Sequence, residues 1–171
     1  MRPEFERLRS IYAAADAAVA SAGPRCDASG RCCRFKEFGH TLFVSQLEAD
    51  YLLAHAPHVD EPVNDATCPF QVENLCTARE PRPLGCRVYF CDPTYQETGA
   101  EISERYLREI KALAVELGLP WRYAPLHVFL EEHVNTVSPR PESSRGALPA
   151  LRSEDSASRL NDKRFPLPTI E

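Results

Sequence analysis

All the cysteines of this chain lie between residues 26 and 91, although the chain continues to residue 171. Several of them are only a few residues apart, and two are adjacent. Short spacings let one loop supply several thiols at little further cost in loop-closure entropy. The cysteine pattern therefore predicts loops gathered around a common centre. The seven residues are Cys26, Cys32, Cys33, Cys68, Cys76, Cys86 and Cys91.

A disulfide framework fits this pattern poorly, because the number of cysteines is odd. A chain of this length, with 43% hydrophobic residues, can also bury a core without covalent cross-links. The alanine-rich N-terminus faintly mimics a signal peptide, but Glu4, Glu6 and Asp16 interrupt it. We therefore predict a cytoplasmic protein, in which clustered thiols bind metal or act in redox chemistry.

Thiolates are soft ligands that select zinc, copper(I) or iron–sulfur clusters. We predict that all seven cysteines are metal ligands, in one four-ligand site with spare thiols or in two incomplete sites. Zinc and a 4Fe–4S cluster are close alternatives; Cys68-Pro69 favours the cluster, because Cys-Pro recurs beside cluster ligands. Nearby arginines are expected to offset the negative charge of the thiolates or to donate hydrogen bonds around them; they are Arg31, Arg34, Arg82 and Arg87.

The order of these motifs resembles that of the YkgJ-type cysteine-cluster family, described as a zinc- or iron-chelating domain. Its signature runs C-x2-C-x2-C-C, C-P-F-L, C and R-P-x2-C-R. Thr41–Glu48 also resembles the strand of that family and the early Glu of its following helix. The resemblance covers residues 26–91 and implies metal binding; some relatives are labelled iron–sulfur proteins or oxidoreductases, and a related cluster occurs in flagellin lysine methylase. The matching residues here are Cys26, Cys32-Cys33, Cys68-Pro69-Phe70, Cys76 and Arg82-Pro83-Leu84-Gly85-Cys86-Arg87.

Two residues depart from this signature. Ser29 stands where the family has its second cysteine, and Gln71 stands in place of a leucine. A serine hydroxyl is a poor ligand for a soft metal. Ser29, a water or His40 therefore completes the site, or the site keeps an open position, which is typical of a catalytic metal.

Hydrophobic periodicity predicts helices at both ends of the cysteine region. Phe5, Leu8, Ile11, Ala15 and Val19 mark a helix from Pro3 to Ser21, and Gly23-Pro24 ends it. The sequence then predicts an extended segment over residues 40–44 and a helix from a Ser45–Glu48 capping box to His55. Two further helices are predicted within residues 101–137, the second starting at Pro125.

Residues 57–93 hold many prolines and few periodic apolar positions, so we predict mainly irregular structure that bound metal orders. Tyr89 and Phe90 are expected to pack in the core beside the site. The predicted fold class is mainly α, with three or four helices around a cysteine-rich loop core and minimal strand. The predicted domain covers residues 1–137, and residues 138–171 are predicted to form a flexible tail.

The net charge of −5 argues against nucleic-acid binding as a function class, and no apolar run is long enough to cross a membrane. Three functional hypotheses remain. The first is an iron–sulfur protein in electron transfer, cluster delivery or support of an enzyme. The second is a structural zinc module that meets a protein partner through its C-terminal part. The third is a metalloenzyme with an open coordination position near Ser29.

Overall fold

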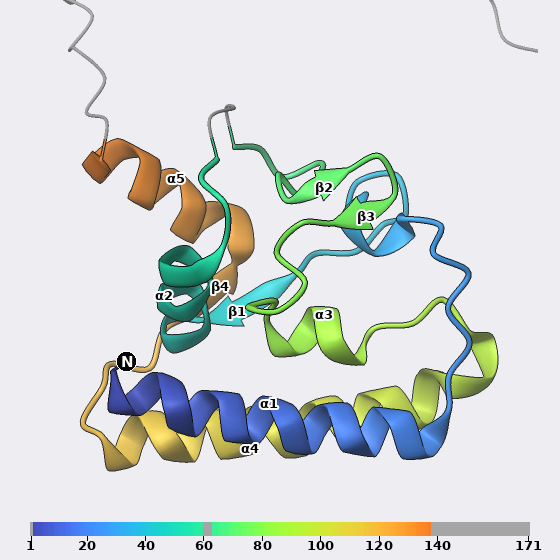
Figure 1. Cartoon of the computed structure of the whole chain (residues 1–171), viewed down its shortest axis with the longest axis horizontal. Helices are drawn as coiled ribbons and strands as arrows, with labels where there is room; N and C mark the ends of the chain where they lie inside the picture. Colours follow the sequence, from blue (N-terminus) through green and yellow to red (C-terminus); the bar gives the residue numbers. More distant parts are fainter. Residues whose placement is uncertain (1, 60–62, 138–171) are drawn as a thin grey trace, which may run out of the picture. The chain divides into compact units, whose positions relative to one another are not determined.

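Helix α1 covers Pro3–Ala22 in the computed structural model, which describes residues 2–59 and 63–137 (Figure 1). Proline at the first turn is compatible with a helix start, because the N–H that proline lacks has no partner there. The helix ends at Gly23, which has φ of 64° and donates from its backbone N–H to the carbonyl of Val19. The predicted apolar stripe is confirmed, except that Tyr12 is fully buried where Ile11 was expected.

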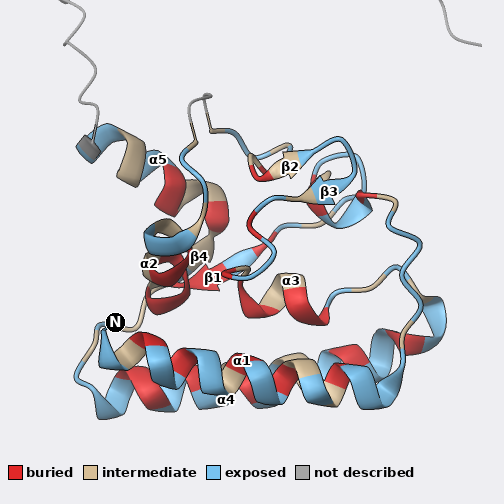
Figure 2. Ribbon diagram, in the orientation of Figure 1, coloured by how far each residue is buried: buried red, intermediate tan, exposed pale blue. Residues whose placement is uncertain are grey.

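Helix α4 covers Gln96–Glu116 and runs antiparallel to α1 (Figure 1). Arg7 near the start of α1 forms a two-pronged ion pair with Glu116 at the end of α4, at 2.7 and 2.6 Å. Figure 2 marks the residues that the two helices bury in their shared core. Tyr106, Ile110 and Leu113 of α4 belong to that core. The prediction of this helix is confirmed, but its start lies earlier, directly after the 3-10 turn η2 at Pro93–Tyr95.

A second core lies around α2, Gln46–His55, and α5, Leu126–Val137. The predicted capping box is present, since the Ser45 hydroxyl accepts from the Glu48 N–H and the Glu48 carboxyl accepts from the Ser45 N–H. Strand β1, Phe43–Ser45, precedes α2 and pairs antiparallel with β4, Tyr123–Pro125, with Val44 opposite Ala124. The sequence did not predict β4, and the extended segment begins at Phe43 rather than at residue 40.

The cysteine region is mostly irregular, as predicted, with short elements between its loops. They are the 3-10 turn η1 at Arg31–Cys33, strands β2 and β3 at Gln71–Val72 and Leu75–Cys76, and helix α3 at Leu84–Val88. Helix α3 was not predicted. Its Leu84 and Val88 side chains join the core of α1 and α4, so α3 ties the loops to the helical layer.

The fold class is mainly α, as predicted, but the described residues contain five α-helices rather than three or four. None of the described helices is both long and apolar enough to span a membrane. The described residues belong to one compact unit. The predicted flexible tail, residues 138–171, lies outside the described residues.

Candidate metal centre

Five of the seven cysteines line one small cavity of about 40 Å³. They come from η1, from the loop before β2, from β3 and from α3, so segments far apart in the chain meet here. The apolar side chains of Leu52, Phe70 and Leu126 also line the cavity. The five lining cysteines are Cys32, Cys33, Cys68, Cys76 and Cys86.

The backbone around Gly30 explains how adjacent cysteines can face one centre. Gly30 has φ of 70°, a conformation that suits glycine, and its carbonyl accepts from the Cys33 N–H at 3.1 Å. The resulting 3-10 turn bends the chain so that the sulfurs of Cys32 and Cys33 lie 3.8 Å apart. The Cys68 N–H donates to the Cys33 carbonyl at 2.8 Å, which joins the two loops directly.

Gln71 also holds this loop, so the departure from the family signature has a structural role. Its side-chain N–H donates to the Gly30 carbonyl at 3.0 Å. A Cβ at residue 30 would lie 2.2 Å from the Gln71 Nε2, so the close approach requires glycine as well. A leucine at residue 71 cannot make this hydrogen bond.

Three thiols of this cavity, those of Cys32, Cys33 and Cys86, have a raised pKa. A hydrogen bond with Cys32 lowers the pKa of Cys33, but its hydrogen bond with Cys68 and its burial outweigh that effect and raise the value to about 12. The hydrogen bond with Cys33, followed by burial, raises the pKa of Cys32. Burial, followed by the nearby Cys33 and Cys76, raises the pKa of Cys86. Without a cation, the thiols of Cys32, Cys33 and Cys86 therefore stay protonated at neutral pH.

The cavity is not a finished metal site. In the described part of the chain, no three His, Cys, Asp or Glu side chains are already arranged as ligands of one ion. Cys26 and Cys91 are exposed and do not line the cavity. Ser29 also lies outside it, and its carbonyl accepts from the Arg34 guanidinium at 3.1 Å. The geometry therefore brings together five of the predicted ligands and leaves two apart.

Arg82 lines the same cavity. Its Nε is buried and has no hydrogen-bond partner among the described residues. Burial, then the nearby charges of Arg79 and Arg87, lower the pKa of Arg82. The Arg82 side chain is half-buried, and a cation partly removed from water is costly unless negative charge lies close by. Thiolates in the cavity are the groups that can supply that charge.

Arg87 is buried, unlike the half-buried Arg82, and its partners differ. It donates to the Asp16 carboxylate at 2.6 Å and to the carbonyls of Arg82 and Glu80. Its guanidinium also lies over the Tyr12 ring, 4.2 Å from the centroid. Arg87 therefore holds the loop before α3 against α1, which places Cys86.

Glu48 joins α2 to the helix that carries Cys86. One carboxyl oxygen accepts from the Ser45 N–H at 2.9 Å and from the Ser45 hydroxyl at 2.8 Å. The other accepts from the Leu84 N–H at 2.9 Å and from the Tyr12 hydroxyl at 3.2 Å. Sequence reasoning identified Glu48 only as a capping residue, because its partners Tyr12 and Leu84 are each 36 residues away.

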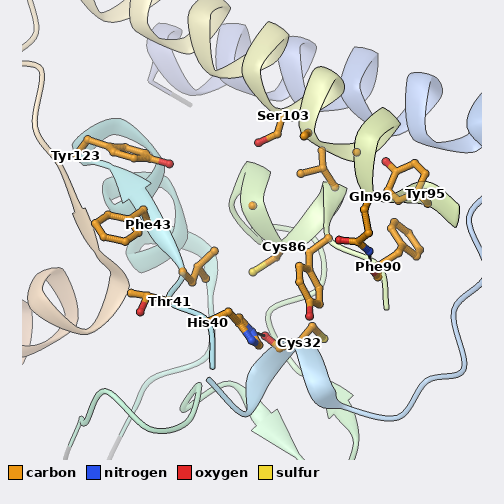
Figure 3. A pocket seen from close by; sticks show the side chains of 16 residues that line it. Cys32, His40, Thr41, Phe43, Cys86, Phe90, Tyr95, Gln96, Ser103 and Tyr123 are labelled. Atoms are coloured by element: carbon orange, nitrogen blue, oxygen red, sulfur yellow. Dashed lines mark hydrogen bonds between the residues drawn. The ribbon is translucent and has the colours of Figure 1, made fainter. Parts of the chain in front are cut away.

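His40 lies beside Cys32 in a second, open pocket of about 330 Å³ (Figure 3). Its Nε2 is 3.3 Å from the Cys32 carbonyl oxygen, and its ring stacks on Tyr89 at 5.0 Å between centroids. Cys32 and Cys86 line both this pocket and the cysteine cavity. The prediction that Tyr89 packs in the core is wrong, since its side chain is 37% exposed, whereas Phe90 packs partly buried against the core of α1 and α4.

Comparisons with known proteins identify no relative from which a role for these residues follows. No family model matches the chain, and neither a curated protein nor a solved structure matches it.

Proposed function

We propose that the chain is a metal-binding protein that holds one thiolate-bound ion, zinc by preference, in the cavity of the five cysteines. The observation that carries the proposal is the convergence of cysteines from separate segments on one cavity, with the Arg82 guanidinium beside them. Four thiolates around zinc carry two net negative charges, which a neighbouring guanidinium stabilises.

The size of the cavity and the sulfur spacing favour a single ion. Two thiolates on one tetrahedral ion, with metal–sulfur bonds of about 2.3 Å, lie about 3.8 Å apart. The Cys32 and Cys33 sulfurs have that separation. In a 4Fe–4S cluster each thiolate binds a different iron, so its ligands are spread further. A cavity of about 40 Å³ also suits one ion better than four irons and four sulfides.

Metal binding in this cavity would cross-link the loops of the cysteine region. These loops have only short helices and strands of their own. When ligands come from segments that are otherwise weakly ordered, the free energy of metal binding becomes free energy of folding. Because the thiols must lose their protons, the affinity for metal is expected to rise with pH. The proposed protein is a module whose cysteine-bearing loops are ordered by zinc. Its contact with a protein partner stays a prediction.

An iron–sulfur cluster remains the alternative occupant, with a redox or cluster-delivery role. The resemblance to the YkgJ-type family remains a prediction that is compatible with either metal. An open coordination position near Ser29 receives no support, because Ser29 lies outside the cavity and five thiols exceed the four ligands that zinc needs.

Metal analysis after purification without oxygen tests the proposal and separates its alternatives. We expect one zinc ion per chain, no colour and no acid-labile sulfide, and a large loss of stability on treatment with a chelator. Brown protein containing iron and acid-labile sulfide would replace the zinc proposal with the cluster. Protein that neither contains nor binds any of these metals, and whose stability a chelator leaves unchanged, contradicts both.

Arg82→Gln is expected to weaken metal binding about 10–100-fold, as is typical for groups that support metal ligands. The same substitution should leave the metal-free protein as stable as before or more stable, because it removes a half-buried cation whose Nε lacks a hydrogen-bond partner among the described residues. Competition with a chelating dye measures the affinity, and urea unfolding of the metal-free protein measures the stability.

Arg79→Gln is the matched control, because Arg79 is a nearby arginine that is exposed and does not line the cavity. Arg79→Gln should change the affinity for metal by less than about threefold. If Arg82→Gln instead destabilises the metal-free protein and leaves metal affinity intact, Arg82 is a packing residue and the electrostatic argument fails.

A further inference from the structure

The pocket beside the cysteine cavity has the size of a small-molecule site. Its volume of about 330 Å³ falls within the range of ligand pockets in proteins, about 300–1,000 Å³. Helix α3 and the segment before β1 form part of its wall, and α4 forms another part, where Ser103 lies (Figure 3). No Asp, Glu, Lys or Arg side chain of the described residues lines it. An uncharged ligand therefore fits the pocket best.

Aromatic rings supply much of this wall, and three of them are unusually exposed. Phe43, Tyr123 and Tyr89 are 44%, 43% and 37% exposed. Scattered exposed apolar residues are normal at protein surfaces, but a group around one hollow indicates a binding surface. Phe43 stacks on Tyr123 with 25° between the ring planes, and Tyr89 stacks on His40 with 18°. Stacked rings around one pocket favour a planar aromatic ligand.

Two polar atoms of the pocket lack hydrogen-bond partners within the part of the chain that the structure describes. They are Nδ1 of His40 and the hydroxyl of Tyr95, both buried. In the neutral imidazole, Nε2 donates to the Cys32 carbonyl, so Nδ1 is left as an acceptor. The Tyr95 side chain is only 5% exposed, and its hydroxyl can donate. Buried polar groups normally have partners. Both atoms have less than 1 Å² of accessible surface, so a ligand that donates and accepts completes the site once the His40 and Tyr95 side chains turn toward it.

The pocket also adjoins the sulfurs of the cysteine cavity. Cys32 and Cys86 line both spaces, and Figure 3 shows their side chains together with His40. A molecule in the pocket would thus lie next to thiols that we assign to the metal centre. A bound ligand can therefore contact these two sulfurs directly, whichever metal they hold.

We propose that this pocket binds a small, uncharged, planar aromatic compound that carries a hydroxyl or amino group, with one edge beside Cys32 and Cys86. The proposal goes beyond metal binding, because it assigns to the protein an organic ligand held next to its metal centre. Ring faces provide the selectivity for planar molecules, and His40 and Tyr95 provide the selectivity for a polar substituent.

Phenol and cyclohexanol are matched probes, because both carry one hydroxyl on a six-membered ring and only phenol is aromatic. Trp121, the only tryptophan, stacks on Tyr123 at 6.0 Å with 6° between the planes, so the NMR signal of its indole N–H reports on the pocket. In the metal-loaded full chain we expect a saturable shift of this signal with phenol. Cyclohexanol should bind at least tenfold more weakly.

Ala100→Phe fills the pocket from α4 and should weaken phenol binding at least tenfold. Ala112→Phe is the control, because Ala112 is also an exposed alanine of α4 but lies about 18 Å further along the helix and outside the pocket. Tyr95→Phe removes only the hydroxyl and should weaken phenol binding about threefold to tenfold while weakening cyclohexanol binding less.

The proposal is overturned if phenol gives no saturable shift, if the two probes bind equally, or if Ala100→Phe binds phenol like the unsubstituted protein. Amide spectra check that each variant is folded, and Tyr95→Phe tests the same site if Ala100→Phe does not fold. Metal content is measured for every sample. Failure of the metal proposal therefore appears in the metal analysis, and failure of this inference appears in the phenol titration.

Discussion

A Cys33→Ser/Cys86→Ser double variant is expected to lose at least a hundredfold in affinity for zinc. The substitutions leave only three of the five cavity thiols, which are fewer than a tetrahedral thiolate site needs. Structural zinc sites bind with about 10–16 kcal/mol, so one of four ligands accounts for about 2.5–4 kcal/mol, or about 10²–10³ in affinity. Two substitutions are required because a single one leaves four thiols that can rearrange around the ion.

Cys26→Ser/Cys91→Ser is the matched control, because it removes the same number of thiols and leaves all five that line the cavity. Its affinity for zinc, measured by competition with a chelating dye, should stay within about threefold of the unsubstituted protein. Equal losses in the two double variants would show that Cys26 and Cys91 are ligands as well. Unchanged zinc binding in both would remove the cavity as the metal site.

Glu48→Ala is expected to destabilise the protein by about 3–5 kcal/mol. The carboxyl group accepts hydrogen bonds from Ser45, Tyr12 and the Leu84 backbone in a fully buried position. A buried donor without its acceptor costs about 1–3 kcal/mol, and the missing side chain adds a cavity. Because Leu84 begins α3, which carries Cys86, zinc affinity should fall as well.

Urea unfolding measures this loss, and two variants serve as references. Gln46→Ala lies on the same helix and removes a partly buried hydrogen bond to Asp50, so we expect a loss of less than about 1 kcal/mol. Glu48→Gln keeps the shape and one acceptor oxygen, so its effect should lie between the two. If Glu48→Ala costs no more than Gln46→Ala, then the buried network does not hold α3 in place.

Elements with local signals could be predicted from the sequence. The stripe of α1 and the capping box of α2 depend on residues a few positions apart, so their patterns are visible without the fold. Helix α3 has only five residues among prolines, too few to show a period. Strand β4 has three residues and pairs with β1 about eighty positions earlier, so nothing local indicates the pairing.

The pocket and the buried network around Glu48 could not be predicted, for the same reason. His40, Tyr95 and Tyr123 come from three separate segments and carry no shared motif. Glu48 has a clear local role as a cap, which hides its longer-range role. Likewise, Asp16 is one polar residue among alanines in α1, and only the packing of α1 against the loop before α3 pairs it with Arg87.

The sequence by itself determined the chemistry that this protein can offer: soft thiol ligands confined to residues 26–91, beside arginines, between helices with clear apolar faces. Only the tertiary structure decided which thiols meet. It gathers five around one cavity and leaves Cys26 and Cys91 at the surface. Spacing along a chain limits how far apart two residues can lie. The contacts of Gly30, Glu48 and Arg87 set the paths of the loops and so decide which thiols meet.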